Sequence, residues 1–337
     1  MAPACATHDE NGPTGQDGRV GAGGRENAAA AREHVFLSYR DLLMGVAYRV
    51  LGRVGDAEDV VQEAWLRWSK ADDGSMTDPE AFLVTVTTRL AIDRLRRVQS
   101  RRETYVGKWL PEPLLTASGT DGDPVQDVLR NESVVLGLLV VLETLSPLER
   151  AVFVLHEVFE WPYSRIGAAL DKSDAAVRQL ASRARTHVRR RRPRFELDPI
   201  TWRRVTDRFI GACMTGEMEG LLELLAPDVR LITDGGGKAM APHRTIAGAE
   251  QVARFLLRIL RFRPTFKNSI GVDPTAPVDY RLVTANAGPA IIVNAADRPI
   301  ACFQLQITDR AIGACYLIVN PEKLAGVMSQ DGPVLRP

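Results

Sequence analysis

The residues of this sequence best suited to chemistry are arginines, and they are concentrated in two short segments. Residues 89–108 carry seven basic and two acidic side chains, and residues 172–194 carry nine basic and one acidic. Arginine binds phosphate through paired hydrogen bonds, so two separate clusters are typical of a protein that holds nucleic acid at two places. Because the segments 1–88 and 109–171 are acidic, the formal net charge of the 337 residues is only +1. This balanced total therefore does not exclude a polyanionic partner.

The second cluster has the pattern of a helix-turn-helix. Residues 164–170 predict a short helix, a three-residue turn follows, and Ser173 caps a longer helix. The apolar residues with the spacing to be buried where the two helices cross are Ile166, Leu170, Val177 and Leu180. In this motif the second helix lies in the DNA major groove, where arginine and glutamine read base edges. The residues expected to face DNA are Ser173, Asp174, Ala175, Arg178, Gln179, Ser182, Arg183 and Arg185. The alternative is an amphipathic helical hairpin with a solvated basic face.

The first cluster lies on a predicted helix that begins at Asp78-Pro79, because an N-cap residue followed by proline is a helix-start signal. The arginines expected to contact nucleic acid from this helix are Arg89, Arg94, Arg96, Arg97 and Arg101. Threonines and Tyr105 lie among them. Basic residues interleaved with hydroxyl and aromatic groups suit a partly single-stranded nucleic acid better than a closed duplex.

The elements that must position these clusters can be predicted from the apolar pattern. Residues 1–30 have neither apolar periodicity nor the apolar core of a signal peptide, which predicts a disordered tail. Apolar residues spaced by three and four predict one helix from His34 and a second over about 56–70. Helical patterning is also present from about Val125 to Arg192.

Two composition changes mark further boundaries. Residues 106–131 are rich in proline, glycine and aspartate and are interpreted as a linker. After Pro193, two helical stretches precede several β-rich runs, so residues 199–330 predict a separate α+β domain. The helical stretches lie near 199–216 and 248–261, and the β-rich runs are 290–294, 300–308 and 312–319.

Composition restricts the class of protein further. Hydrophobic residues make up 45% and charged residues 25% of the chain, as in ordinary globular proteins. No apolar run approaches the ~18 residues needed to span a bilayer, so a membrane protein is not expected. The four cysteines have no CxxC or Cys/His zinc spacing. This indicates a cytoplasmic protein without a structural metal, and no cofactor is expected.

Two longer motifs lie in the helical parts. The first runs through Tyr48-Arg49-Val50-Leu51-Gly52 and residues 56–67 and 79–97, and the second runs from Leu145 to Arg185. They resemble regions two and four of bacterial sigma factors of the extracytoplasmic-function class. The resemblance implies two all-α sigma domains, over 31–105 and 132–194. The usual glycine of the region-four turn is Asp171 here, and aspartate tolerates the left-handed conformation moderately well.

The resemblance also implies roles for these residues. The helix 56–70 would bind core RNA polymerase through a polar face made of Asp56, Glu58, Asp59, Gln62 and Glu63. The helix 79–102 would recognise and melt the minus-ten promoter element, and the helix 174–185 would read the minus-thirty-five element. The implied activity is promoter-specific transcription initiation. An acidic helix is also a common solvated face in any protein, and that is the alternative for 56–70.

Three short segments resemble signatures of the SigJ-like subgroup of these sigma factors. They are Trp109-Leu110-Pro111-Glu112-Pro113, Asp234-Gly235-Gly236-Gly237-Lys238 and Asn320-Pro321-Glu322-Lys323-Leu324. The subgroup carries a C-terminal SnoaL-like domain with the NTF2-like cone fold, which is thought to regulate sigma activity in cis. We therefore expect the last two segments to contact the linker. The residues expected in this contact are Trp109, Pro111, Glu112, Pro113, Asp234, Gly235, Gly236, Gly237, Lys238, Asn320, Pro321 and Lys323.

Two alternatives concern the C-terminal domain. Cone-shaped relatives include isomerases and cyclases with a buried carboxylate base, for which Asp234, His243, Asp279 and Arg281 are the polar candidates. Their spacing is not convincing, and an aspartate before three glycines usually anchors a turn, so no enzyme is expected. The other alternative is a one-component regulator that binds DNA through the helix-turn-helix and senses a small ligand in the cone. Such a regulator would not need the region-two motif.

Overall fold

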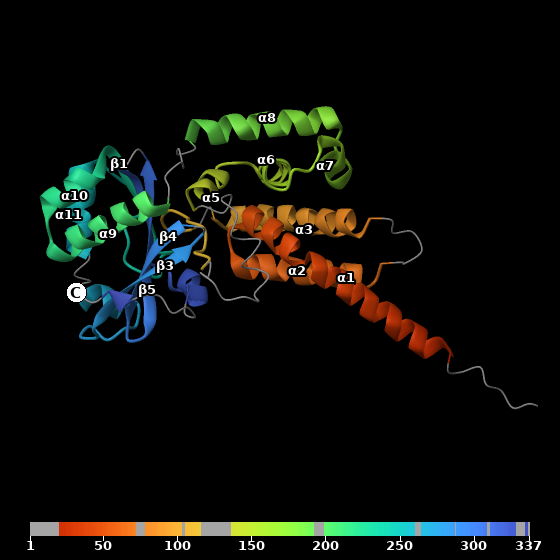
Figure 1. The fold of residues 1–337 in the computed structure, drawn as a ribbon, viewed down its shortest axis with the longest axis horizontal. Helices are drawn as coiled ribbons and strands as arrows, with labels where there is room; N and C mark the ends of the chain where they lie inside the picture. Colours follow the sequence, from red (N-terminus) through yellow and green to blue (C-terminus); the bar gives the residue numbers. More distant parts are fainter. Residues whose placement is uncertain are drawn as a thin grey trace, which may run out of the picture.

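A computed structural model describes residues 20–71, 78–102, 105–115, 136–191, 199–259, 264–286, 288–308, 311–327 and 334–335. Figure 1 shows a helical half and a sheet half side by side. Hydrogen bonds from residues 105–115 reach both halves, so this part of the linker lies between them. None of the described helices is long and apolar enough to cross a membrane.

Three helices form the first helical part, which we call region two: α1 (Val20–Leu51), α2 (Val54–Trp68) and α3 (Pro79–Arg102). Gly52 has a φ of +73° and separates α1 from α2. The carboxylate of Asp78 accepts a hydrogen bond of 2.9 Å from the backbone N–H of Ala81, so the predicted start of α3 is confirmed.

The first helix differs from its prediction. α1 begins at Val20, whereas the apolar pattern predicted a helix from His34 and composition indicated a disordered tail over residues 1–30. The four alanines from Ala28 to Ala31 have high helix propensity and favour helix before His34. Residues before Val20 lie outside the described part of the chain.

The second helical part, which we call region four, contains α5 (Leu136–Leu142), α6 (Pro147–Phe153), α7 (Tyr163–Leu170) and α8 (Asp174–Arg191). Ser146 and Glu149 form a capping box at α6, which continues into a π-helix at Val154–Val158. Asp171 ends α7 in the left-handed conformation (φ 55°, ψ 52°), as its place in the turn predicted. The helix expected from about Val125 falls in 116–135, outside the described residues.

Regions two and four share one apolar core. It extends from Phe36 in α1 through Leu95 in α3 to Val188 in α8 without a break. Beside it, buried Arg150 of α6 donates a 2.9 Å hydrogen bond to the backbone oxygen of Arg49 in α1. The two regions are therefore packed together rather than held apart by the linker.

The C-terminal domain is a seven-stranded sheet with helices. Its strands are β1 (Leu225–Asp234), β2 (Ile246–Ala247), β3 (Val278–Ala285), β4 (Gly288–Ala295), β5 (Arg298–Thr308), β6 (Ala311–Ile318) and β7 (Val334–Leu335). They lie in the order β2-β1-β6-β5-β4-β3-β7, and β1 and β6 are the parallel pair. The helices are α9 (Pro199–Thr215), α10 (Met218–Leu224), α11 (Ala249–Ile259), α12 (Pro264–Ser269) and α13 (Pro321–Leu324).

The sheet is covered on both faces. Strand residues pointing to one face pack against α9, α10 and α11, and form the domain's own core. Residues pointing to the opposite face, among them Tyr316 and Ile318, pack against Leu110 and Leu115 of the linker and Leu136 of α5. Alternation along each strand sends successive side chains to opposite faces, so one sheet builds two cores. The second core joins the C-terminal domain to the helical half.

Candidate functional site

The outer face of α8 is the first candidate interface. All of the residues predicted to face DNA, apart from Arg185, are exposed, while Val177, Ala181 and Ala184 between them are buried. The hydroxyl of Ser173 accepts a hydrogen bond from the N–H of Ala176, so the predicted cap is present. A Cβ at Gly167 would lie 2.7 Å from the backbone oxygen of Lys172, so the tight turn that aims α8 needs glycine in α7.

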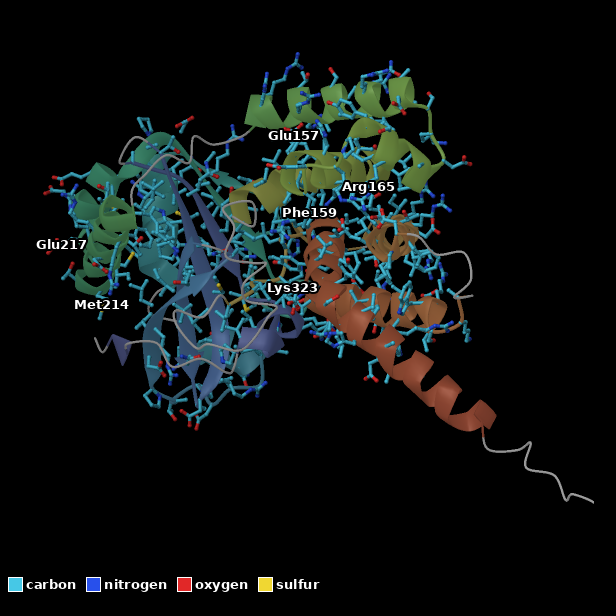
Figure 2. The ribbon with its side chains drawn as sticks, turned by 45° about the vertical axis from the view of Figure 1, so that its right-hand side comes forward. Glu157, Phe159, Arg165, Met214, Glu217 and Lys323 are labelled. Atoms are coloured by element: carbon cyan, nitrogen blue, oxygen red, sulfur yellow. The ribbon has the colours of Figure 1, made fainter. Side chains whose placement is uncertain are left out.

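Arg185 differs from the other residues of this set. Its guanidinium donates a 2.7 Å hydrogen bond to the Tyr163 hydroxyl and lies 3.3 Å from the carboxylate of Glu157 in the π-helix. Glu157 is labelled in Figure 2 below α8. Arg185 therefore joins α8 to the rest of region four. It lies on the side of α8 and not on the outer face with the other residues expected to face DNA.

The arginines of α3 are also engaged within the molecule. Arg89 donates a 2.7 Å hydrogen bond to the backbone oxygen of Ala169 in α7. Arg94 lies 2.6 Å from Asp56 and 2.7 Å from Asp59, while Arg96 pairs with Asp93 at 3.1 Å. Arg97 donates to the backbone oxygen of Asp93 at 3.3 Å. The side chain of Arg101 lies outside the described part of the structure.

The acidic face of α2 is largely as expected. Glu58, Asp59, Gln62 and Glu63 are exposed, so they are available to a partner surface. Asp56 is the exception, because it is buried and its carboxylate accepts two hydrogen bonds from Arg94. Asp56 stabilises the packing of α3 on α2 and is not part of the exposed acidic face.

The three short segments meet at one place, which we call the linker junction. The carboxylate of Asp234 accepts hydrogen bonds from the N–H of Leu110 at 2.8 Å and from Lys323 at 2.7 Å. It also accepts one from the Tyr105 hydroxyl. Asp234 is 0% exposed and Lys323 1%. Figure 2 shows Lys323 where the sheet half meets the helical half.

Lys323 completes the same junction from the other side. Its ammonium group donates to the backbone oxygen of Leu110 and lies 3.2 Å from the centre of the Trp109 ring. One linker residue thus has its N–H bound by Asp234 and its C=O bound by Lys323. The backbone oxygen of Asp234 also accepts from Val319 at 2.9 Å. The Asp234 carboxylate accepts hydrogen bonds both from the linker and from its own domain, so it is more than the anchor of a turn.

Glycines in the loop after Asp234 permit this close approach. Gly236 has a φ of +61°, and a Cβ there would collide with the Asn320 amide and lie 3.0 Å from the Tyr105 hydroxyl. A Cβ at Gly237 would lie 3.1 Å from Val106 of the linker. Any side chain would push the loop away from the linker, so glycine is required at the contact. Lys238 and Glu322 then form an exposed ion pair across the loop.

Pro111, Glu112 and Pro113 are buried on the opposite side of the linker, against region two. The Glu112 carboxylate accepts from the N–H of Val54 at 3.1 Å, and its backbone oxygen accepts from the Tyr48 hydroxyl at 2.8 Å. Burial raises the pKa of Glu112, and the Val54 N–H and the Arg53 charge oppose that shift. The linker is therefore bound by region two and by the C-terminal domain at once.

Two further residues complete the junction and were not among the predicted contacts. The Asn286 amide donates a 2.7 Å hydrogen bond to the Tyr48 hydroxyl, and the Asn286 N–H donates to the Leu114 oxygen at 2.7 Å. Tyr105, predicted near nucleic acid, binds Asp234 instead, and burial with that carboxylate raises its pKa, so it stays a proton donor. Tyr48 and Asn286 are 238 residues apart, and no local pattern in the sequence connects them.

The candidates for an enzyme site are not brought together. Asp279 accepts from the Asn294 amide at 2.9 Å and lies 3.4 Å from Arg281, and all three belong to β3 and β4. His243 instead lines a shallow surface cavity with residues 241–246 and Gln251. No group of three metal-ligating side chains occurs within the described residues.

Comparisons with known proteins agree with the arrangement of the helical half. A family model described as Sigma-70 region 2 matches residues 35–102, and one described as Sigma-70, region 4 matches residues 136–188. The ECF RNA polymerase sigma factor SigJ of Mycobacterium tuberculosis is 40% identical over 295 residues, which cover 86% of this chain and 92% of that relative. The probable ECF RNA polymerase sigma factor SigI of the same organism is 36% identical over 223 residues, covering 66% and 74%.

A solved structure extends this similarity to the C-terminal half. The crystal structure of the extracytoplasmic function sigma factor SigJ of Mycobacterium tuberculosis superimposes with a TM-score of 0.68 and 35% identity. The match covers 86% of this chain and 96% of that chain. The predicted order of two helical parts followed by an α+β domain is confirmed.

Proposed function

Since this chain belongs to the extracytoplasmic-function family of RNA polymerase sigma factors, we propose that its C-terminal domain regulates its activity in cis by holding the linker. Sigma factors bind core RNA polymerase and promoter DNA and direct transcription initiation, and they are not enzymes. We also propose that α3 contacts the minus-ten element and that the outer face of α8 contacts the minus-thirty-five element. The exposed acids of α2 contact the polymerase.

The spacing of promoter elements supports a closed, inactive arrangement. The minus-ten and minus-thirty-five elements lie along a duplex that extends ~3.4 Å per base pair, so the regions that contact them must be tens of ångströms apart. In this structure Arg89 of α3 lies 2.7 Å from Ala169 of α7, and both regions share one core. The two regions must separate before they can bind both elements. A domain that fixes the linker between them opposes that separation.

The observation that carries the proposal is the capture of Leu110. Its N–H and its C=O are bound by the buried pair Asp234 and Lys323, which belong to the C-terminal domain. On the other face of the linker, Glu112 is held by region two. Releasing the linker therefore means exposing or breaking a buried ion pair, which is costly. We expect the C-terminal domain to inhibit transcription until core polymerase or another signal displaces it.

Run-off transcription with core polymerase tests this proposal. We expect Asp234→Ala to raise transcription several-fold, because the linker loses the acceptor for Leu110 and the partner of Lys323. The matched control is Asp279→Ala, which removes a carboxylate bound only within the same domain. A chain ending at residue 195 should behave like Asp234→Ala. Equal transcription from all four proteins would remove the proposal.

The direct DNA contacts are tested in the same assay. Arg178→Ala with Arg183→Ala removes two exposed cations from the outer face of α8 and should reduce promoter binding strongly. Arg208→Ala, an exposed arginine of α9 that pairs with Glu223, is the control. Promoter binding that survives the double substitution would exclude α8 as the recognition helix. The alternative of a one-component regulator requires no polymerase, so retention of core enzyme by the chain counts against it.

A further inference from the structure

A cavity of about 410 Å³ lies beside the linker junction. Its wall is built by three separate parts of the chain: the α2–α3 pair of region two, the linker and the turn that begins α13. The lining residues are Arg53, Asp56, Arg94, Arg97, Val98, Tyr105, Trp109, Asn320, Glu322 and Lys323. Cavities of this size are typical of sites for small molecules.

The charged groups of the wall are unevenly matched. Arg94 is paired with Asp56, Lys323 with Asp234, and Glu322 with Lys238. Two guanidinium groups remain after these pairs. The described residues place no carboxylate within ion-pair distance of Arg97, which donates only to the backbone oxygen of Asp93.

Arg53 is the other weakly paired cation, and its guanidinium group lies 6.0 Å from the centre of the Trp109 ring. Its buried Nε has no hydrogen-bond partner among the described residues, and the nearest carboxylate oxygen, on Asp56, is 4.0 Å away. That carboxylate already accepts two hydrogen bonds from Arg94. A buried donor without an acceptor is costly, and an anion in the cavity would satisfy it. The two carboxylates of the wall, Asp56 and Glu322, are thus held by Arg94 and Lys238, and Arg53 and Arg97 have no close carboxylate of their own among the described residues.

We propose that this cavity binds a phosphorylated small molecule of nucleotide size, with its phosphates on Arg53 and Arg97. Phosphate oxygens match the forked donors of a guanidinium group, and two arginines from separate elements, Arg53 before α2 and Arg97 on α3, favour more than one phosphate. Asn320 and Trp109 line the same cavity, where the Asn320 amide donates a 3.0 Å hydrogen bond to the Tyr105 hydroxyl. The ammonium group of Lys323 lies beside the rings of Tyr105 and Trp109. The cavity therefore suits the charge of a ligand rather than a base stacked on those rings.

Because of the position of the cavity, a bound ligand would also affect the hold on the linker. This part of the inference rests on the proposed cis regulation. Arg53 and Arg97 belong to region two, whereas Asn320 and Glu322 belong to the C-terminal domain. A ligand in contact with both stabilises the arrangement in which they are adjacent and not the open one. The ligand therefore strengthens the hold on the linker and acts as a co-repressor.

Isothermal titration of the full chain with ATP, inorganic pyrophosphate and uncharged adenosine tests the site. ATP and pyrophosphate should bind and adenosine should not. Arg53→Gln and Arg97→Gln should each weaken binding roughly tenfold or more, because each removes a charged donor. The control Arg67→Gln changes an exposed arginine of α2 that pairs with Glu63 outside the cavity. Circular dichroism checks that the variants keep their helices.

Three outcomes would overturn the site: no binding of either phosphate compound, equal weakening by Arg67→Gln, or binding of single-stranded DNA alone. The last result would assign the two arginines to promoter DNA. Hydrogen exchange of the backbone amides in residues 105–115 tests, without polymerase, whether the ligand strengthens the hold on the linker. ATP should slow this exchange in the parent chain and should not slow it in Arg53→Gln. Failure of the regulatory proposal is seen separately, as unchanged transcription by Asp234→Ala.

Discussion

Two ion-pair contacts between parts of this molecule differ in how far their charges are exposed to water. At the α7–α3 contact, Arg165 lies 3.1 Å from Asp78 and 3.2 Å from Glu80, and the side chains are 30%, 55% and 33% exposed. At the linker junction, Lys323 and Asp234 are almost completely buried. Figure 2 labels Arg165 in region four and Lys323 at the boundary between the halves.

The difference indicates distinct roles for the two contacts. Exposed ion pairs contribute about 0–1 kcal/mol and are screened by salt, so the Arg165 pairs add little to the apolar core that α3 and α7 share. A buried pair contributes little net stability while intact, but removal of one partner leaves an uncompensated charge. We therefore expect substitutions at the linker junction to have larger effects than substitutions of Arg165. The following substitutions test this ranking, from the largest effect to the smallest.

Lys323→Met should have the largest effect. It leaves the Asp234 carboxylate buried without its cation and is expected to lower the free energy of unfolding by about 3–5 kcal/mol. Chemical denaturation of the full chain measures it. Adding Asp234→Asn to this variant removes the uncompensated charge and should recover part of the loss. No recovery would show that packing of the lysine chain, rather than charge, stabilises the junction.

Gly236→Ala should come next. Left-handed strain costs roughly 1–2 kcal/mol, and the collision with Asn320 and Tyr105 adds about 1–3 kcal/mol. Gly271→Ala is a matched control, since Gly271 has a φ of +70° and open space around the position of a Cβ. The difference between the denaturation midpoints of the two variants measures how much the close approach of Gly236 to the linker contributes to stability. Equal midpoints would mean that the loop does not need this approach.

Tyr48→Phe removes the hydroxyl that connects region two, the linker and the C-terminal domain. The Glu112 oxygen loses a donor and the Asn286 amide loses an acceptor, so we expect a loss of about 1–2 kcal/mol. Limited proteolysis within residues 105–115 should become faster than in the parent chain. Tyr280→Phe in β3 provides a comparison at a position outside the junction. An unchanged cleavage rate in Tyr48→Phe contradicts the bridging role.

Arg165→Ala should have the smallest effect, below about 1 kcal/mol, and salt should reduce it further. Denaturation of this variant and the parent at low and high salt measures the difference. If Arg165→Ala destabilises the chain as much as Lys323→Met, the ranking of the two contacts is reversed.

Local chemistry made several parts of this protein predictable. The cap at Asp78, the left-handed Asp171 and the exposed face of α8 depend on residues within a few positions of one another. The strands β4, β5 and β6 were also recognisable from their apolar runs. No element was predicted over β1 or β3, although β1 ends in Asp234 and β3 leads to Asn286 at the junction.

The sequence by itself determined the family, the order of helical and sheet parts, and the three segments that meet at the linker. These features follow from motifs and periodicity, which neighbouring residues encode. Only the tertiary structure decided which charged side chains form ion pairs within the molecule and which are exposed to a partner. Arg94 pairs with Asp56, 38 residues away, and Arg185 pairs with Glu157, so neither is displayed as its pattern predicted. Ion pairing and burial depend on distances between elements, and packing sets those distances.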